Sequence, residues 1–317
     1  MLVTGGPCQH LRFDAVRSVL PEGALVVLND SRVVPARLYF ERDGDDRRFE
    51  LLWCEPAPSV LAGQELRAWV RGAKKLREGD RLTCGEVSVR YVRVDEVDPR
   101  ARVFRVESGD LFEVATSRGS LPLPPYIARP EGTTDEDRAR YQTVYARPPG
   151  SVAAPTAGLH FTEELLEQIP HEFVTLHVGP GTFLPMEAED VRAHRVGTER
   201  FSLSEGAAAR IESARASGRP IIAVGTTTTR ALESVARENG GRIVPGSFST
   251  DLVITPGFRF QVIVGLLTNF HLPRSSLLML VCSLGGVEEV LAAYREAVRE
   301  GYRFYSYGDA MFVRRRG

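Results

Sequence analysis

The chain has 317 residues, of which 43% are hydrophobic and 26% are charged, and its formal net charge is -1. This balance excludes a polycation, and no apolar run approaches the ~20 residues needed to span a bilayer, so we expect no membrane segment. Because single cores stop growing at roughly 250–300 residues, the length predicts two cores.

The first third of the chain is rich in short β-type runs. Its first residues, MLVTGGPCQHLRFD, lack the basic and apolar parts of a signal peptide, so we expect a cytosolic protein. Residues 24–28 and 33–40 predict two strands separated by a turn at Asn29-Asp30-Ser31. Period-two runs then follow up to about residue 108: RFELLW, ELRAWV, DRLTCG, VSVRYVRV and RVFRVES. Many short strands at regular spacing predict a small barrel or a sandwich.

The second half alternates strand and helix patterns, after a segment at residues 119–150 that is rich in proline, glycine and charge. Buried strands or core segments are predicted at FVTLHV (173–178), PIIAVG (220–225) and LLMLVCSLG (277–285). Amphipathic helices are predicted at FTEELLEQI, EGAAARIESARASG, TRALESVAREN and VEEVLAAYREAVREG. This alternation indicates a layered α/β domain in which a parallel sheet is favoured.

The cysteines argue against a zinc site and against a disulfide framework. They are far apart and never form a C-x-x-C pair. We therefore expect no bound metal. The four positions are Cys8, Cys54, Cys84 and Cys282.

A nucleic-acid partner would need a local basic face, because the net charge is near zero. One candidate lies between Arg67 and Arg81 and includes Lys74 and Lys75, across a strand, a loop and the next strand. Such a cluster could follow a phosphate backbone, and a solvated loop is the alternative.

Small residues at 150–159 lead to His160, and Thr162 is a candidate N-cap for the helix that follows. Small side chains let a ligand approach the backbone, and a helix N-terminus offers N–H groups to an anion. His160 could act there as an acid or base at neutral pH. The alternative is a tight core turn with a satisfied histidine, which this segment alone favours.

Two further loops follow predicted strands. His177 ends one strand and precedes Gly179-Pro180-Gly181-Thr182, a candidate phosphate or ribose loop, although a single Gly-x-Gly is weak evidence. Gly225 ends another and precedes four threonines and Arg230, which suit ribose, carboxylate or phosphate. In the alternative interpretation the threonines only cap the helix.

Polar residues also interrupt the apolar segment 266–281, where Asn269 and His271 lie between two hydrophobic runs. Embedded polar groups need partners, and active sites are where such groups are retained, so a function is favoured here. Near the C-terminus, aromatic residues surround Gly308-Asp309. They suit base stacking or core packing, and core packing is favoured for most of the rings.

Together these segments resemble the S-adenosylmethionine:tRNA ribosyltransferase-isomerase family of the queuosine pathway. So many ordered matches are more specific than one glycine-rich loop. The matching stretches run in the family's order: VLNDSRVVPARL, PPYIARP, RYQTVYA, VAAPTAGLHFT, VTLHVGPGTFLP, VGTTTTRALES, TDLVITPGF, LLTNFHLPRSSLLMLV and YRFYSYGDAM.

The resemblance implies a β-barrel domain of residues 41–119 inserted into an α/β domain of residues 1–40 and 120–317. It also implies a reaction: the ribosyl part of S-adenosylmethionine is transferred to the aminomethyl group of a 7-deazaguanine base at the tRNA wobble position. The products are epoxyqueuosine-tRNA, adenine and methionine. S-adenosylmethionine is then a co-substrate, and no separate cofactor is expected.

The implied chemistry assigns candidate roles. The sulfonium acidifies the adjacent ribose C–H bonds, so a base of near-neutral pKa is needed, and His160, His177 and His271 are the candidates. Asp309 is the candidate proton donor to adenine. The candidate tRNA contacts are Lys74, Lys75 and Arg140. The candidate substrate-binding residues are Thr156, Gly158, Gly179, Gly181, Thr182, Gly225, Thr226, Thr227, Arg230 and Asn269.

The chain departs from the family pattern in three places. It starts inside the family's first strand, at Leu2-Val3, without the preceding segment that contains an Arg-Asp pair. In the stretch that starts at His194, Gly197 replaces a second histidine, and Val264 replaces an acidic residue. A tRNA-binding member without turnover is therefore the alternative function, and a free nucleoside is the alternative substrate. The oligomeric state is open, with a monomer favoured.

Overall fold

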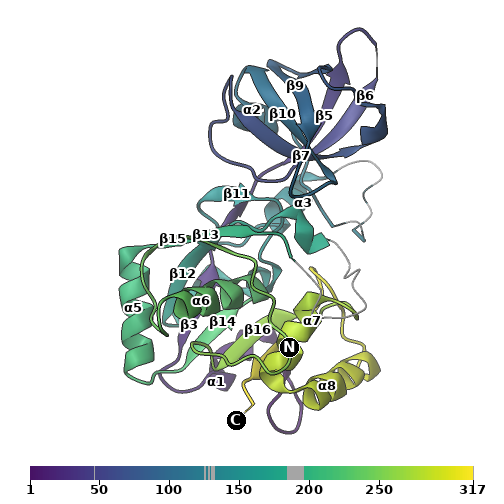
Figure 1. The fold of residues 1–317 in the computed structure, drawn as a ribbon. Coiled ribbons are helices and arrows are strands. Elements are labelled where there is room, and N and C mark those ends of the chain that lie inside the picture. The colour runs from purple at the N-terminus through teal and green to yellow at the C-terminus, as the bar shows by residue number, and fades with distance from the viewer. Residues whose placement is uncertain (46, 125, 128, 130–132, 184–195, 317) are drawn as a thin grey trace.

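The computed structural model describes residues 1–317 with the exception of 46, 125, 128, 130–132, 184–195 and 317. Within the described residues, the chain forms a nine-stranded sheet, a closed six-stranded barrel and a small two-stranded sheet. Figure 1 shows the barrel at the top and the large sheet with its helices below it. The predicted combination of a layered α/β domain and a small barrel is confirmed.

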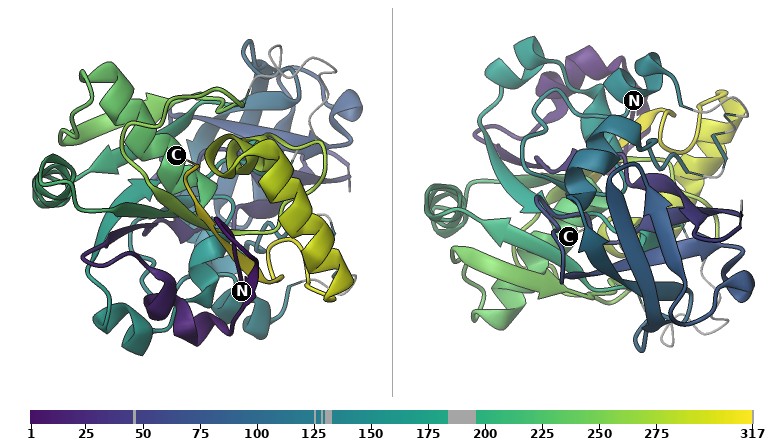
Figure 2. Two further views of the ribbon diagram at one scale, coloured as in Figure 1. Left: turned by 90° about the horizontal axis from the view of Figure 1, so that it is seen from below. Right: turned by 90° about the horizontal axis from the view of Figure 1, so that it is seen from above.

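The large sheet has a parallel centre with antiparallel additions. In sheet order its strands are β15 (Gly246–Thr250), β13 (Glu199–Leu203), β12 (His171–Leu176), β3 (Leu25–Asn29), β14 (Ile221–Val224), β16 (Gly265–Asn269), β17 (Ala310–Arg314), β1 (Leu2–Val3) and β2 (Gln9–His10). Strands β12, β3, β14 and β16 are parallel, whereas β13 and β17 are antiparallel to them. Strand β1 pairs with β17, so the chain begins and ends on neighbouring strands (Figure 2).

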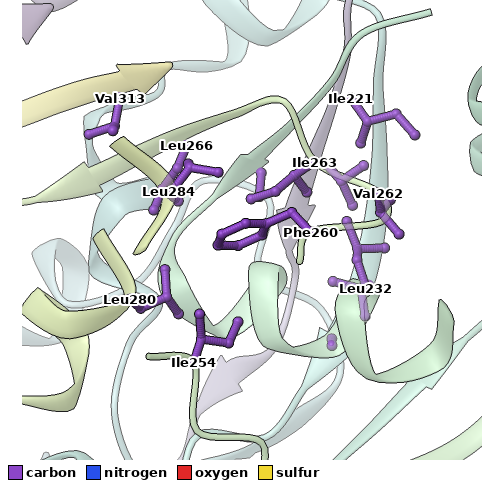
Figure 3. Close-up of a cluster of buried hydrophobic side chains, with 14 of the residues drawn as sticks. Ile221, Leu232, Ile254, Phe260, Val262, Ile263, Leu266, Leu280, Leu284 and Val313 are labelled. Carbon is purple, nitrogen blue, oxygen red and sulfur yellow. The ribbon is translucent and has the colours of Figure 1, made fainter. Parts of the chain in front are cut away.

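Each face of the sheet has its own hydrophobic core, because successive strand residues point to opposite faces. In β3, Val27 packs in the larger core and Val26 in the smaller one. The larger core, part of which is shown in Figure 3, is covered by α5 (Glu205–Ala216), α6 (Thr226–Glu238), α7 (Ser276–Gly285) and α8 (Val287–Arg299). The smaller core is covered by η1 (Phe13–Ala15), α1 (Val16–Val19), η3 (Thr156–His160) and α4 (Glu163–Glu167).

Most predicted elements of the second half are confirmed, but residues 277–285 are not a strand. They form helix α7, which begins after Ser275, whose hydroxyl accepts the N–H of Leu278. A uniformly apolar run has no period, and this one is rich in leucine, a good helix former. No single helix in the described part of the chain is long and apolar enough to cross a membrane, although the bent pair α7 and α8, at 114°, reaches that length and composition together.

The barrel is built from the period-two runs. Its strands are β5 (Arg37–Arg42), β6 (Arg48–Trp53), β7 (Glu65–Arg71), β8 (Arg81–Cys84), β9 (Val87–Val94) and β10 (Ala101–Ser108), which close in the order β10-β7-β6-β5-β8-β9. Alternate side chains, such as Leu38 and Phe40, fill its core. The short η2 (Ala73–Lys75) follows β7, and α2 (Leu111–Arg118) packs Leu111 and Ala115 against the barrel core.

The predicted boundary between residues 40 and 41 falls inside β5, which begins at Arg37. The strand-like pattern of residues 33–40 continues into the barrel, so periodicity does not place this boundary. Around it, β4 (Arg32–Val33) pairs in parallel with β11 (Pro149–Ser151), and α3 (Asp135–Arg140) lies in the segment that returns from the barrel. The remaining short helix is η4 (Pro180–Phe183).

The side chain of Glu233, on α6, stabilises the larger core by accepting backbone N–H groups from another segment. Its side chain is fully buried, and its carboxylate accepts the N–H groups of Gln261, Val262 and Ile263 at 2.8–3.1 Å. These three donors belong to the segment that leads into β16, and the hydrogen bonds of Val262 and Ile263 are buried. Glu233 therefore connects α6 to the segment that positions β16.

Replacing Glu233 by alanine should lower the free energy of unfolding by about 3 kcal/mol, because the buried N–H groups of Val262 and Ile263 and the partly buried one of Gln261 lose their acceptor. Denaturant unfolding followed by circular dichroism measures this change. Glu238→Ala, at an exposed position of the same helix, is the matched control and should change the free energy by less than about 0.5 kcal/mol. Equal losses in the two variants would contradict the structural role of Glu233.

Candidate active site

The carboxyl ends of the four parallel strands face the barrel. Strand β3 leads through β4 directly into the barrel strand β5, and Figure 1 shows this end of the sheet pointing upward. Along the chain the strands come in the order β3, β12, β14, β16, whereas the sheet order is β12, β3, β14, β16. The connections therefore leave β3 and β14 in opposite directions. In open α/β sheets a ligand crevice forms at such a switch point.

Helix α6 begins at this switch point with an N-terminus that no side chain caps. Its N-cap is Gly225, with φ 86°, a conformation that favours glycine. Thr228 and Thr229 do not cap the helix, because their hydroxyls donate backward to the carbonyls of Val224 and Gly225 at 2.8 and 3.2 Å. The alternative in which the threonines serve as caps is therefore wrong for these two. The first turn, with Thr226 and Thr227, therefore presents N–H groups without a side-chain cap, the arrangement found where helices bind anions.

The short helix η3 lies across this end of the sheet. A side chain at Gly225 would contact Ala157 at 3.7 Å, so η3 packs directly against the start of α6. Thr156 Oγ1 donates to Asn269 Oδ1 at 3.0 Å, and Asn269 Nδ2 donates to His160 Nε2 at 3.3 Å. Asn269 is the last residue of β16. The structure thus joins three predicted site residues in one hydrogen-bonded chain.

His160 is held as a neutral imidazole. Burial lowers its pKa to about 4, and the negative charge of Asp309 opposes this shift. Its ring stacks on Phe13 at a centroid distance of 5.0 Å. Because Asn269 donates to Nε2, the basic nitrogen is directed toward the end of β16. At neutral pH the ring is therefore uncharged, and its Nε2 lone pair accepts the Asn269 amide.

Asp309 reaches this region on the loop that precedes β17. Its Oδ2 accepts the N–H of Arg303 at 2.8 Å and lies 3.6 Å from the Arg303 Nε. The same loop is attached to the end of β16, because Tyr305 N–H donates to the carbonyl of Phe270 at 3.0 Å. Asp309 and His160, both predicted site residues, therefore lie near enough to interact electrostatically.

His271 lies on the opposite face of the sheet from His160. Its Nε2 is hydrogen-bonded to Thr268 Oγ1 at 2.7 Å, and its backbone N–H donates to the Tyr294 hydroxyl on α8 at 2.8 Å. Thr268 and Asn269 are successive strand residues, so their side chains point to opposite faces. Strand β16 thus separates two of the three candidate bases.

His177, the third candidate, follows β12. A side chain at Gly150 would overlap its ring, so glycine is required there for packing. Burial lowers the pKa of His177, and the positive charge of Arg200 lowers it further. Within the described part of the chain its buried Nδ1 has no hydrogen-bond partner. The structure therefore leaves a role for His177 as a prediction.

The loop at Gly179 is connected to Arg230 through Glu199, a residue that the sequence interpretation did not select. Gly179 N–H donates to Glu199 Oε1 at 3.4 Å, and Arg230 forms a buried ion pair with the other oxygen. Arg230 Nε also donates to the carbonyl of Leu252 at 2.9 Å. The Arg230 guanidinium therefore has partners within the protein, so its burial is explained without a substrate carboxylate. Glu199 ends the stretch that starts at His194, which itself lies outside the described residues.

Gly181 and Thr182 are exposed in η4 beside this connection. Gly197 is also exposed, and a side chain there would meet no atom of the described residues within 4 Å. This departure from the family pattern therefore leaves room for a larger residue as far as the described part of the chain extends.

Gly158 packs closely against Tyr145, which leaves no room for a side chain. A side chain there would overlap the hydroxyl of Tyr145, whose ring in turn contacts Phe173 of β12 at 5.3 Å. Tyr145 is buried, and its hydroxyl has no partner of good geometry among the described residues. A role of Gly158 in substrate binding stays a prediction, and its contact with Tyr145 is a reason for glycine at this position.

Asp30, directly after β3, is a buried acidic residue that was not among the candidate site residues predicted from the sequence. Its carboxylate is buried and accepts the Thr175 hydroxyl at 2.6 Å, and burial raises its pKa. The sequence did contain a signal for Asp30 and for Tyr145, because each lies in one of the stretches that carry the family resemblance.

The predicted tRNA contacts lie on two elements. Lys74 and Lys75 are exposed on η2 of the barrel. Arg140 is exposed on α3, pairs with Glu136 at 2.9 Å and lies over the ring of Tyr307 at 5.9 Å. These positions fit a long substrate that contacts both domains.

A cavity of about 310 Å³ also lies where the barrel meets β13. It is lined by Arg67 and Asp95 of the barrel and by Arg200 of β13. Arg67 and Asp95 already form an ion pair at 2.8 Å. We assign no substrate group to this cavity.

Comparison with known proteins identifies the family. Residues 1–313 match the family model described as queuosine biosynthesis protein. The chain belongs to this family. A relative from Anaeromyxobacter dehalogenans (strain 2CP-C), named S-adenosylmethionine:tRNA ribosyltransferase-isomerase, is 49% identical over 98% of this chain and 90% of its own length. One from Desulforamulus reducens with the same name is 44% identical over 96% of this chain and 89% of its own length.

A solved structure supports the same assignment. The crystal structure of S-adenosylmethionine tRNA ribosyltransferase from Thermotoga maritima has 29% sequence identity and a TM-score of 0.50, and the match covers 98% of this chain and 91% of that one. The stretches that carry the resemblance to the queuosine biosynthesis family include those that form η3, the start of α6, the end of β16 and the loop before β17.

In this family member, Gly158→Ala should lower the free energy of unfolding by about 2 kcal/mol through overlap with Tyr145. Adding Tyr145→Phe removes the overlapping oxygen and should recover part of the loss; the nearby Thr143 methyl limits the recovery. A double-mutant cycle measured by denaturant unfolding checks this. Gly206→Ala on α5, where a side chain meets only Arg210 at 3.5 Å or more, is the control. Simple additivity in the cycle would rule out the contact.

Burial lowers the pKa of His271 to about 4 from 6.5. A depressed folded-state pKa means that stability present above the unfolded-state value is lost as the pH falls toward the folded-state value. The loss is on the order of 3 kcal/mol between these two values. His271→Gln should therefore show a weaker fall in unfolding free energy between pH 6.5 and 4, with the exposed His10→Gln as control. Parallel stability curves for wild type and His271→Gln would contradict this assignment.

Proposed function

We propose that this chain transfers and isomerises the ribosyl moiety of S-adenosylmethionine onto the aminomethyl group of a 7-deazaguanine base in tRNA. The relatives' shared name supports the reaction class. The products are epoxyqueuosine-tRNA, adenine and methionine. The observation that carries the proposal is the Thr156–Asn269–His160 chain beside the uncapped start of α6, at the switch point of the sheet.

His160 is the base in this proposal. The sulfonium of S-adenosylmethionine acidifies the ribose C–H bonds next to it, and a neutral imidazole removes one of these protons. The electron pair that remains on carbon forms a double bond to the neighbouring ribose carbon, the bond from that carbon to the ring oxygen breaks, and the oxygen becomes the carbonyl of the opened sugar as adenine leaves and is protonated. His160 suits this step because burial keeps it neutral and its Nε2 lies at the end of β16, where the ribose C–H takes the place of the Asn269 amide that donates to this nitrogen. His271 does not suit it, since it lies on the opposite face of β16 from the Thr156–Asn269–His160 chain.

Asp309 assists by charge. The imidazolium formed at His160 is stabilised by a nearby carboxylate, and Asp309 already opposes the lowering of the His160 pKa. Its role as the proton donor to adenine remains a prediction. Arg303 holds the carboxylate in place through its backbone N–H.

The first turn of α6 is proposed to bind the polar ends of S-adenosylmethionine. Uncapped N–H groups attract the methionine carboxylate, and Thr226 and Thr227 offer hydroxyls for it or for the ribose. Gly181 and Thr182 are exposed on η4 for the remaining contacts. S-adenosylmethionine is consumed in this scheme, so it is a co-substrate and no cofactor is required.

The tRNA is proposed to lie against both domains. Lys74 and Lys75 on the barrel and Arg140 on α3 are exposed cations that suit its phosphates. Each phosphate contact makes binding salt-dependent, which separates tRNA from a free nucleoside as the substrate. A tRNA substrate also implies that the enzyme works in the cytosol.

The test is adenine release. Purified protein is incubated with S-adenosylmethionine and tRNA that carries the aminomethyl precursor, and free adenine is quantified by chromatography. His160→Gln should lower kcat by about 100-fold or more, as expected for loss of a general base. It should still bind tRNA.

His10→Gln is the matched control, since His10 is exposed on β2. Wild-type protein that binds tRNA but releases no adenine would overturn the proposal in favour of a tRNA-binding family member without turnover. Full activity in His160→Gln would leave the reaction but remove His160 as its base.

A further inference from the structure

Two exposed tyrosines from distant parts of the chain contact each other at the edge of the site. Tyr126 is 48% exposed and Tyr305 is 37% exposed. Among the phenylalanine, tyrosine and tryptophan residues whose side chains the structure describes, these two are the exposed ones. Their ring centroids are 4.8 Å apart at an interplanar angle of 31°. Large aromatic rings that remain exposed together usually mark a binding surface.

Hydrogen bonds hold each of the two tyrosines in place. The Tyr126 hydroxyl is hydrogen-bonded to Ser306 Oγ and also accepts the N–H of Ser306 at 3.2 Å. Tyr305 N–H donates to the carbonyl of Phe270, the residue after β16. The pair is therefore attached through the Tyr305 backbone to the segment that follows β16. They do not fill the core, because each keeps more than a third of its surface exposed.

The backbone here adopts an unfavourable conformation. Tyr305 has φ 73° and Arg274 has φ 57°, and both lie in loops beside the carboxyl end of β16. Among the described residues, three that are not glycine have positive φ, and these are two of them. Strain of this kind persists where the surroundings require a particular geometry, which is most often at functional sites.

We propose that Tyr126 and Tyr305 form a stacking platform for a nucleobase of the tRNA, next to the base that is modified. This inference rests on the proposed function. A base that undergoes chemistry must leave the stack of its neighbours, and an aromatic surface beside the site replaces the lost stacking. RNA loops are recognised in this way by tyrosine rings.

The charges around the platform suit the phosphates of the same RNA. Arg303 is exposed two residues before Tyr305. Arg140 of α3, a predicted tRNA contact, lies over the ring of Tyr307, two residues after Tyr305. Figure 1 shows the C-terminal loop, in yellow, beside α3 and below the barrel. The platform is thus continuous with the path proposed for the tRNA.

The direct test places 2-aminopurine next to the wobble nucleotide of an anticodon stem-loop RNA that carries the precursor base. Stacking quenches 2-aminopurine fluorescence, so wild-type protein should quench it on binding. Tyr305→Phe keeps the ring and should retain quenching, whereas Tyr305→Leu should lose most of it. Equal quenching by the phenylalanine and leucine variants, or none by wild type at any nucleotide of the loop, would overturn the platform.

The kinetic test uses Tyr305→Gly, because glycine adopts φ 73° without strain and the variant should fold at least as stably as wild type. Its KM for the RNA should rise about tenfold, the effect of losing one stacked base. Its KM for S-adenosylmethionine should not change. Val298→Ala, at an exposed position on α8, is the control.

The two proposals fail in different ways. If wild type releases no adenine, the proposed reaction fails, and the fluorescence experiment still decides the platform. If wild type is active and the KM for RNA is unchanged in Tyr305→Gly, the platform fails and the reaction stands.

Discussion

The common direction of β12, β3, β14 and β16 is the constraint on which the whole site depends. Parallel strands end at the same edge, so the loops that follow them meet although they are far apart in the chain. The N-terminus of α6 brings unpaired N–H groups to this edge, and η3 lies across it because Thr156 and His160 are both bonded to Asn269 of β16. Loss of the parallel pairing would separate all of these groups.

Several polar and small residues near the site act on the fold. The Asn29 side-chain amide bonds both the N–H and the C=O of Leu176, which extends the pairing of β3 and β12 by one step. Glu199 ties Arg230 to the loop at Gly179. Gly158 leaves room for the Tyr145 hydroxyl. These groups are already partnered within the protein, whereas the first N–H groups of α6 have no side-chain cap.

The position of the barrel gives the site its access to a large substrate. Strand β3 enters the barrel almost directly, so the carboxyl ends of the sheet open toward the second domain and not toward free solvent. A substrate of RNA size can then contact exposed lysines on η2, Arg140 on α3 and the C-terminal loop at the same time. Of the paired tyrosines, Tyr305 belongs to this C-terminal loop and Tyr126 contacts it from the segment that returns from the barrel.

The amino-acid sequence by itself determined the features that depend on local patterns. Period-two runs predicted the barrel strands, helical periodicity predicted α5, α6 and α8, and the ordered stretches identified the family. Tertiary structure decided what depends on contacts between distant residues: the helical state of the uniformly apolar α7, the opposite faces of His160 and His271, the contact of Gly158 with Tyr145, and the pairing of Tyr126 with Tyr305. Neighbouring residues set a period, but which face a side chain takes and which partner it meets are set by packing across the sheet.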